Sequence, residues 1–320
     1  MNDSLKNLSP LDGRYQNKTE RSRELFSEFA LIKQRISVET QWLNYFLTNF
    51  KPELLTEKIE EKINTLHTTV PNSLIERVKE IENTTNHDVK AVEIAVAEQF
   101  EESEEIQSLV HIFLTSEDIN SLSYALMLKE AHPMLLDWIE NIIQALEDLA
   151  EKNKEVAMLA RTHGQPASPT TLGKELNVFV TRLKKEKRSL SDKRFYAKWG
   201  GATANFNPHL LAYPEEDWIK HSKEFLSNFG VKFTKVATQI EPHDYMADLF
   251  QNIQRVNNIM LDLTQDIWSY IAFEYFSLKM KKNEVGSSTM PHKVNPIDFE
   301  NAEGNLGLSN AIFSHLEKDR

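Results

Sequence analysis

Residues 286–301 combine the groups that acid–base chemistry needs. They read GSSTMPHKVNPIDFEN, so two adjacent hydroxyls, Ser287 and Ser288, come shortly before the ammonium of Lys293. Asn295 and the proline after it predict a helix start, with Asn as the N-cap and Pro at the first helical position. A donor-rich loop that leads into a helix N-terminus is an anion-binding arrangement. This stretch could therefore hold an anion and present a serine to it.

Three further segments place polar side chains at predicted helix starts. They are NTTNHD at 83–88, TSED at 115–118 and RTHGQPASP at 161–169. TSED matches a capping box, and the Ser-Pro pair at 168–169 predicts a new helix beyond the third segment. If these helix ends converge with the one near Asn295, the site suits a substrate with several carboxylates or a phosphate. A histidine, with an ordinary pKa of about 6.5, could donate a proton there while an activated serine removes one. Such a pair could carry out an elimination.

The composition indicates a mostly helical protein and excludes several classes of protein. The 320 residues include only nine Gly and eleven Pro, and 27% are charged. The absence of cysteine excludes disulfides and thiol nucleophiles, and the ten histidines lack zinc-ligand spacing, so neither a metal nor a cofactor is expected. A net charge of −11 argues against nucleic acid as a partner. Without a secretory leader or an apolar run of about 18 residues, the protein is expected to be cytoplasmic and not to enter a membrane.

Apolar spacing predicts the elements that must position these groups. Residues 245–285 contain no Gly or Pro and carry a heptad seam from Leu249 to Ile267, which predicts a helix of roughly 60 Å. A helix of that length suggests a bundle completed by other subunits. A short extended piece is expected within 230–240. An acidic run near residue 105 predicts a boundary between an N-terminal helical domain, 1–105, and a central helical-bundle domain, 106–320.

Six motifs resemble those of the fumarase/aspartase superfamily, and in particular its bacterial adenylosuccinate lyase branch. They are SPLDGRY at 9–15, TTNHDVKAVE at 84–93, TSEDIN at 115–120, RTHGQPA at 161–167, TQIEPHDY at 238–245 and GSSTMPHKVNP at 286–296. The resemblance implies an all-α fold of long helices, whose central domain joins a multi-subunit helical core. It also implies a homotetramer with shared active sites. The family continues well beyond residue 320 into a third domain, so we expect this chain to be C-terminally truncated and poorly active.

The resemblance also implies a reaction and a set of roles. The enzyme would cleave adenylosuccinate to AMP and fumarate, and would cleave the succinylaminoimidazole carboxamide ribotide in the same way. Ser287 would be the general base, His163 the general acid, and Glu300 the residue that orients His163. The succinyl carboxylates and the carbanion would be held by Lys293, Asn295, Thr115, Ser116 and Thr162, with Ser288 also binding substrate. The nucleotide would be contacted by Arg14, Tyr15, Asn86, His87, Asp88 and Gln239.

Two alternatives stay open at this point. The chain could be another fumarate-releasing lyase, such as argininosuccinate lyase, or a non-catalytic scaffold that keeps the fold. A further histidine, His111, could line the site or belong to the core.

Overall fold

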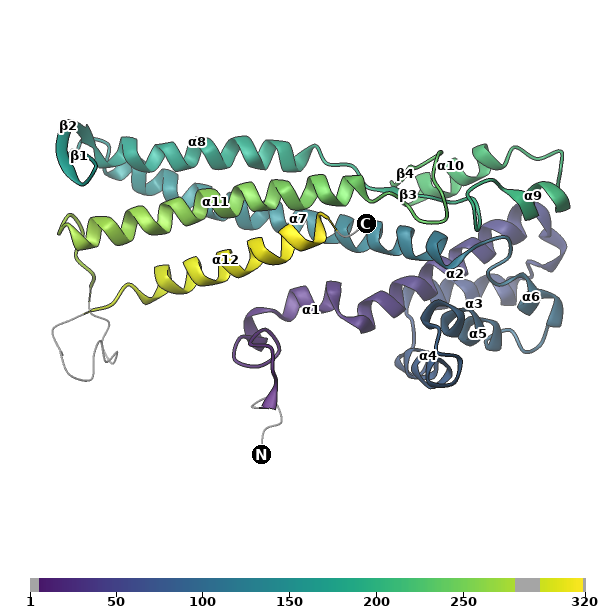
Figure 1. Ribbon diagram of the computed structural model, residues 1–320. Helices are drawn as coiled ribbons and strands as arrows, with labels where there is room; N and C mark the ends of the chain where they lie inside the picture. Colours follow the sequence, from purple (N-terminus) through teal and green to yellow (C-terminus); the bar gives the residue numbers. More distant parts are fainter. Residues whose placement is uncertain (1–5, 280–293, 319–320) are drawn as a thin grey trace. The chain divides into compact units, whose positions relative to one another are not determined.

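The computed structural model describes residues 6–279 and 294–318, and these fold mostly into α-helices (Figure 1), which confirms the expected all-α class. The chain forms two compact units. One comprises residues 1–133 with 194–242, and the other comprises 134–193 with 243–320. This division does not follow the expected boundary at residue 105, which stays a prediction.

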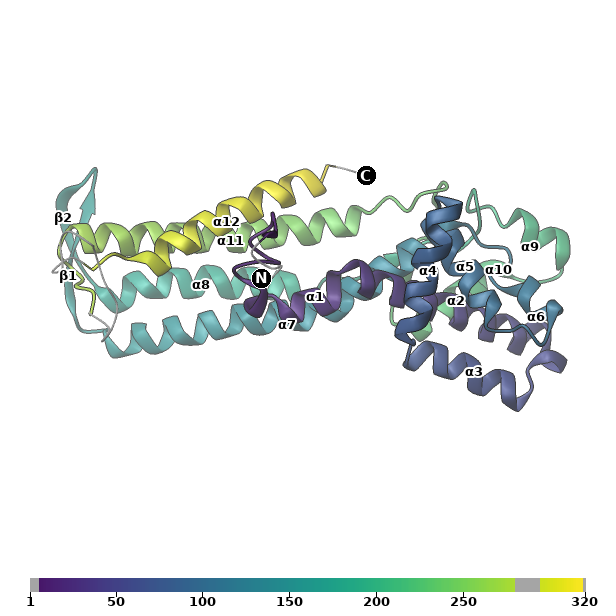
Figure 2. The same ribbon diagram turned by 90° about the horizontal axis from the view of Figure 1, so that it is seen from below.

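The first unit is built on the helix α2 (Glu28–Phe50), whose buried face is covered by shorter helices (Figure 2). Its other elements are η2 (Gln16–Lys18), α1 (Glu20–Phe26), η3 (Pro52–Leu54), α3 (Glu57–Thr68), α4 (Asn72–Thr85), α5 (Asp88–Glu98), α6 (Glu104–Leu109), the first part of α7 (Ser116–Lys152), α9 (Asn207–Ala212) and α10 (Trp218–Asn228). A short parallel pair, β3 (Tyr196–Ala197) with β4 (Lys232–Phe233), confirms the extended piece expected within 230–240.

An aromatic cluster forms the centre of this unit. Trp42 of α2 packs edge-on against Trp199 and Phe225, with ring centroids 5.3 and 5.1 Å apart. Next to this cluster, the ring of His209 is fully buried between Phe113 and other aromatic side chains, and neither of its nitrogens has a hydrogen-bond partner in the described residues. Burial, aided by the charge of Lys198, lowers the pKa of His209 to about 4.

A buried ion pair fixes the start of α7. Asp118 and Lys198 are both fully buried, with Nζ 2.7 Å from Oδ1. The same carboxylate accepts the backbone N–H groups of Thr115, Gly200 and Gly201. Gly201 has φ +77°, and a Cβ there would lie 3.0 Å from a backbone oxygen. Glycine is therefore the residue that suits the position from which this N–H is donated. Burial raises the pKa of Asp118, and the Lys198 ammonium and the N–H groups of Thr115 and Gly200 oppose that rise.

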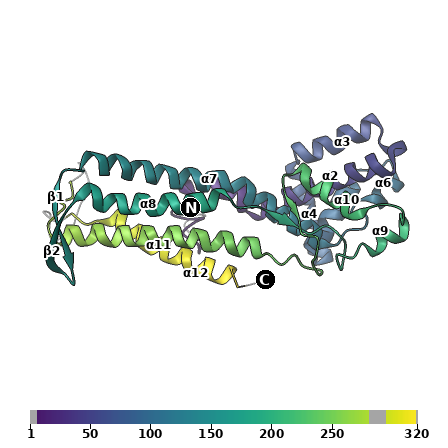
Figure 3. The ribbon, with the colours of Figure 1, turned by 90° about the horizontal axis from the view of Figure 1, so that it is seen from above.

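The second unit is a bundle of long helices with a hairpin. The last part of α7 lies beside α8 (Leu172–Ser191), joined by ion pairs such as Lys187 to Glu140 at 2.7 Å (Figure 3). Helix α11 (Asp244–Ala272) packs against both α8 and α12 (Ile297–Leu316). Along α11, the heptad positions Leu249, Val256 and Leu263 are buried as expected.

The helix start expected at 168–169 is wrong, because that stretch is a strand. Residues 157–171 form an antiparallel hairpin of β1 (Ala157–Thr162) and β2 (Gln165–Thr171), and α8 begins only after it. The loop holds two residues, His163 and Gly164, with φ of 53° and 72°. Positive φ at both positions is the requirement of a type I′ turn, the connection best matched to strand twist. Thr171 supplies the α8 cap, accepting the N–H of Lys174.

The uninterrupted helix expected over 245–285 is also wrong, because α11 ends at Ala272. The chain closes in a Schellman motif: the N–H of Tyr275 bonds the carbonyl of Tyr270 at 2.8 Å, and that of Glu274 bonds Ile271 at 3.1 Å. Glu274 has φ 62°, a left-handed conformation that costs a non-glycine residue about 1–2 kcal/mol. The rings of Tyr270 and Tyr275, at 6.0 Å, supply the apolar contact that accompanies this motif.

Breaking the Asp118–Lys198 pair should strongly destabilise the first unit. We expect Lys198→Met to lower the free energy of unfolding by about 3–5 kcal/mol, because it leaves a buried carboxylate without its counter-charge. The double variant Asp118→Asn/Lys198→Met should recover part of that loss. Urea unfolding followed by tryptophan fluorescence measures both. The control is Lys79→Met, which removes an exposed pair and should barely move the midpoint; a Lys198→Met midpoint equal to that control would contradict the prediction.

The buried His209 should make stability depend on pH. The unfolded chain takes up a proton near pH 6.5 while the folded chain resists it until about pH 4. The contribution of His209 to the free energy of unfolding is therefore fully present above pH 6.5. It falls by about 1.4 kcal/mol per pH unit as the pH is lowered from 6.5 toward 4. His209→Phe should remove this contribution to the slope, whereas Phe225→Leu should lower stability equally at every pH. Denaturant unfolding between pH 7.5 and 4.5 tests both; a His209→Phe slope identical to that of the parent would rule the assignment out.

Candidate active site

The segment 83–88 forms a helix end followed at once by a helix start. Asn86 ends α4 in the left-handed conformation, with φ 51°. His87 is the N-cap of α5, and its Nδ1 accepts the N–H of Lys90 at 3.1 Å. Asp88 occupies the first position of α5, where its carboxylate faces the positive end of the helix. All three side chains are exposed, so they are available to a ligand.

Thr115 and Ser116 stand where α7 begins, as the capping box predicts. The N–H of Thr115 is taken by Asp118 at 2.8 Å, the reciprocal bond of that motif. One residue earlier in the helix, the carboxylate of Glu117 accepts the N–H of Glu241 at 3.3 Å. That contact ties segment 238–241 to the first turn of α7, and the exposed Gln239 lies on this segment.

Arg35 of α2 joins these two helix starts. Its Nη2 lies 2.8 Å from the Asp88 carboxylate and its Nε donates to Asn120 of α7 at 2.9 Å. The Arg35 side chain is only 5% exposed, whereas that of Asp88 is 50% exposed. Partial burial raises the pKa of Asp88, but the Arg35 guanidinium and the N–H of Val89 outweigh it and leave the pKa below its ordinary value. The N-termini of α5 and α7 thus converge around one buried cation.

His111 is half-buried and pairs with a buried acid. That acid, Glu39, lies on α2 one turn beyond Arg35. The Nδ1 of His111 lies 2.6 Å from Oε1 of Glu39, which has no exposed surface. Burial lowers the pKa of His111, but the Glu39 carboxylate opposes this effect. The net result is a pKa above the ordinary value of histidine. Of the two roles left open for His111, the geometry shows contact with the core.

Two other expected nucleotide contacts, Arg14 and Tyr15, make no bond to the starts of α5 and α7 in the described residues. Arg14 and Tyr15 lie in the turn before η2, with the guanidinium 5.9 Å from the phenol ring centroid. Arg14 is exposed and Tyr15 is half-buried. The structure shows no hydrogen bond from either side chain to the α5 or α7 starts within residues 6–279.

In the second unit, the expected acid His163 sits at the tip of the β1–β2 hairpin, next to Thr162, and both are exposed. It therefore does not stand at a helix N-terminus, which corrects that expectation. Glu300 is exposed in the first turn of α12, and Asn295 precedes the Pro296 N-cap rather than serving as the cap itself. No hydrogen bond joins His163 to Glu300 in the described part of the chain. The expected site also includes Ser287, Ser288 and Lys293, which lie outside the described residues.

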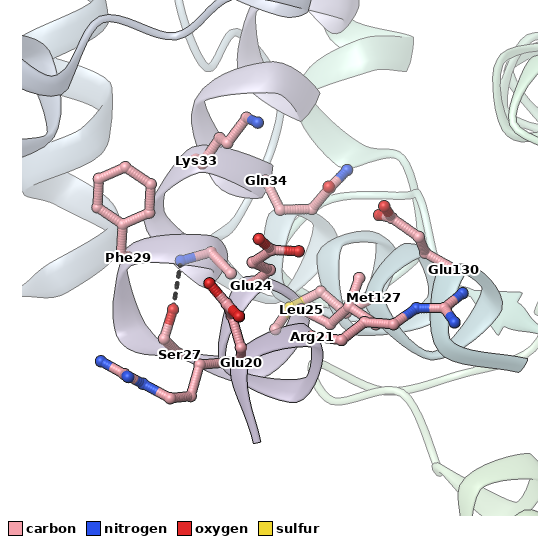
Figure 4. Close-up of a pocket in the computed structure, with 12 residues that line it drawn as sticks. Glu20, Arg21, Glu24, Leu25, Ser27, Phe29, Lys33, Gln34, Met127 and Glu130 are labelled. Atoms are coloured by element: carbon pink, nitrogen blue, oxygen red, sulfur yellow. Dashed lines mark hydrogen bonds between the residues drawn. The ribbon is translucent and has the colours of Figure 1, made fainter. Parts of the chain in front are cut away.

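A cleft of about 850 Å³ lies where α1 and α2 meet α7 (Figure 4). Charged side chains of both signs line it, among them Arg21, Glu24, Lys33 and Glu130. None of the expected site residues lines this cleft. Its mixed charge offers no single class of ligand a matching surface.

Sequence reasoning missed the buried charges that hold the site together. Arg35 and Glu39 are four residues apart on α2, on a face that is otherwise apolar and buried. That spacing places them on one side of the helix. Two opposite charges inside an apolar stripe are the signal that could have found them, because buried charges are rarely left unpaired.

No group of three or more His, Asp or Glu side chains is arranged to hold a metal ion in the ranges 6–279 and 294–318. Over the same ranges, no helix has the length and apolarity to span a membrane.

Comparison with known proteins identifies the family. A family model described as lyase matches residues 13–310. The adenylosuccinate lyase of Legionella pneumophila (strain Corby) is 50% identical, and that of Escherichia coli K12 is 45% identical, each over 98% of this chain and 70% of the relative. The adenylosuccinate lyase of Dictyostelium discoideum is 42% identical.

Solved structures agree on the fold. A fumarate lyase from Mesorhizobium sp. BNC1 matches with a TM-score of 0.73 at 18% identity, over 92% of this chain and 64% of that one. A 3-carboxy-cis,cis-muconate lactonizing enzyme from Pseudomonas putida matches with a TM-score of 0.75, over 92% of this chain and 65% of its own. Because both the family match and the relatives extend over nearly the whole sequence, the chain belongs to the lyase family and, within it, to the adenylosuccinate lyases.

Proposed function

We propose that this protein cleaves adenylosuccinate to AMP and fumarate, and cleaves succinylaminoimidazole carboxamide ribotide to the carboxamide ribotide and fumarate. The observation that carries the proposal is the 45–50% identity to adenylosuccinate lyases over 98% of the chain. The same relatives favour this substrate over that of argininosuccinate lyase, and they favour an enzyme over a non-catalytic scaffold. A cytoplasmic location stays a prediction from the sequence.

The first unit supports a site for an anionic substrate. Two helix N-termini, those of α5 and α7, converge on the buried cation Arg35, and the positive ends of helix dipoles attract carboxylates and phosphates. Thr115 and Ser116 would hold a succinyl carboxylate. Asn86, His87 and Asp88 would contact the nucleotide, joined by Arg14, Tyr15 and Gln239, as the family resemblance implies.

The proposed reaction is an elimination in which one proton leaves carbon and one reaches nitrogen. Ser287, as the alkoxide, would take the proton from the succinyl carbon next to a carboxylate. The electron pair left on that carbon would form the fumarate double bond as the C–N bond breaks. His163 would then protonate the departing nitrogen, which gives AMP. The exposure of His163 at a hairpin tip leaves its ring accessible for that transfer.

The remaining residues would stabilise charge rather than move protons. Lys293, Asn295, Thr162 and Ser288 would surround the carboxylates and the carbanion, since fixed donors aimed at developing charge supply much of an enzyme's rate enhancement. Glu300 would orient His163, from the same chain or from another subunit. The proposal needs neither a metal nor a cofactor.

A homotetramer with shared sites is part of the proposal. The helix α12 has no buried residue in the described chain, and its side chains Ile297, Leu308 and Ile312 are 54%, 57% and 50% exposed. A helix with apolar residues this exposed is suited to packing against further helices. Other copies of this chain are the proposed partners, so that each active site would draw on several subunits.

Substitution of the proposed acid or the proposed base should slow turnover while substrate binding is retained. We expect His163→Gln to lower the turnover number by about 100-fold to 10,000-fold with a small change in KM, because it removes the proton donor and little else. Ser287→Ala should abolish turnover but leave adenylosuccinate binding measurable by calorimetry. A spectrophotometric assay of adenylosuccinate loss follows the rates.

The matched control for these variants is Ser168→Ala, an exposed position on the same hairpin. It should retain parental turnover. If His163→Gln turned over as fast as Ser168→Ala, the acid assignment would be wrong; parental rates in Ser287→Ala would overturn the base assignment.

The tetramer should depend on the exposed apolar residues of α12. Light scattering should give a mass about four times the 37.0 kDa of one chain. Leu308→Glu with Ile312→Glu should lower that mass, because two charges would be buried in the interface. Asn305→Glu adds a charge at an exposed polar position on the same helix and is expected to keep the parental mass. A monomeric parent chain would contradict the proposed assembly.

A further inference from the structure

The hairpin that carries His163 has a tip whose orientation is not set by the histidine itself. The His163 ring is exposed and makes no hydrogen bond within the described residues. The pairing of β1 with β2 is irregular between Leu159 and Arg161, which loosens the ladder just before the tip. A group that must transfer a proton needs closer positioning than an exposed two-residue loop provides by itself.

A phenol from the end of α11 reaches this irregular segment. The hydroxyl of Tyr275 donates to the carbonyl of Leu159 at 3.0 Å and accepts from Nε of Arg161 at 3.0 Å. Arg161 in turn donates from Nη1 to the carbonyl of Gly164 at 3.0 Å. One hydroxyl thus connects both sides of the irregularity, and the guanidinium carries the connection to the residue that follows His163.

Two further contacts limit the movement of Arg161. Its guanidinium carbon lies 4.7 Å from the ring centroid of Phe273 and 5.5 Å from that of Tyr275. A guanidinium that stacks on aromatic rings and donates two directed hydrogen bonds is held in one orientation. The Schellman end of α11, with Glu274 at φ 62°, turns the chain so that Tyr275 follows Phe273 onto the hairpin.

We propose that Tyr275 is a positioning residue for His163, acting through Arg161 and the hairpin backbone to hold the imidazole in the geometry that proton transfer requires. The inference rests on the proposed function of His163 as the general acid. Tyr275 itself does not touch the reacting atoms. Its hydroxyl, and not merely its ring, carries the effect, because only the hydroxyl bonds Leu159 and Arg161.

The test removes that hydroxyl from the whole chain. Tyr275→Phe should lower the turnover number about tenfold or more while KM changes less than twofold, because the acid is misplaced and the binding groups are not. Amide hydrogen exchange over residues 160–166 should become faster. The matched control is Tyr270→Phe, which removes a neighbouring hydroxyl that makes no hydrogen bond in the described residues; its kinetics and exchange should equal those of the parent.

Exchange and kinetics separate this inference from the proposed function. Unchanged exchange over 160–166 in Tyr275→Phe would overturn the inference whatever the activity. Faster exchange with a parental turnover number, in a chain that His163→Gln inactivates, would reduce Tyr275 to a structural contact and also overturn it. If His163→Gln is fully active, the proposed role of His163 as the general acid has failed instead. Should Tyr275→Phe not fold, Arg161→Lys, which keeps the charge but loses the forked donors, is expected to show the same slow turnover and faster exchange.

Discussion

The first unit depends on the buried carboxylate of Asp118. Asp118 receives the Lys198 ammonium and the N–H groups of Thr115, Gly200 and Gly201, while no part of it reaches solvent. A carboxylate moved out of water is tolerated only when its acceptor positions are filled together. The same set of bonds to Asp118 therefore fixes both the start of α7 and the loop after β3. Neither segment can shift without leaving a charge unpaired in an apolar interior.

That constraint extends from stability to the site. The loop anchored by Asp118 also carries Trp199 into the aromatic cluster around Trp42, so α7 is set relative to α2. Helix α2 in turn presents Arg35, which bonds the starts of α5 and α7. Buried charges inside this helix contribute little net stability, because desolvation opposes their attraction. Their effect is to bring two helix N-termini to one place and keep them there.

Local signals in the sequence were sufficient wherever short-range bonds decide the structure. The starts of α5 and α7 were predictable because N-cap and capping-box residues act within one turn, and the buried seam of α11 because its spacing is regular. The hairpin at 157–171 was missed because Ser168-Pro169 has helix-start chemistry, and the competing signal, His163-Gly164 as a two-residue turn, is weak when the first residue is a histidine. The end of α11 was missed because Glu274 adopts a left-handed conformation normally left to glycine.

Partners distant in sequence were out of reach of any local reading. The Tyr275 hydroxyl and the Leu159 carbonyl are 116 positions apart, and Lys198 is 80 positions from Asp118. Such pairs form only once the helices have packed, so residue spacing does not reveal them. The sequence could show that Asp118 caps a helix, but not that a buried ammonium accompanies it.

The change from helix start to hairpin tip alters what His163 can contribute. A helix N-terminus would have surrounded the imidazole with aligned N–H dipoles and made its segment part of the anion-binding surface. A two-residue turn has no such field, so in the proposed mechanism the attraction of charge would fall to helix N-termini, such as those of α5, α7 and α12. What a hairpin supplies instead is direction, since each strand fixes the backbone on one side of the tip. If His163 is the acid, as proposed, the binding of charge and the orientation of the acid depend on different kinds of structure, and a substitution that disturbs one need not disturb the other.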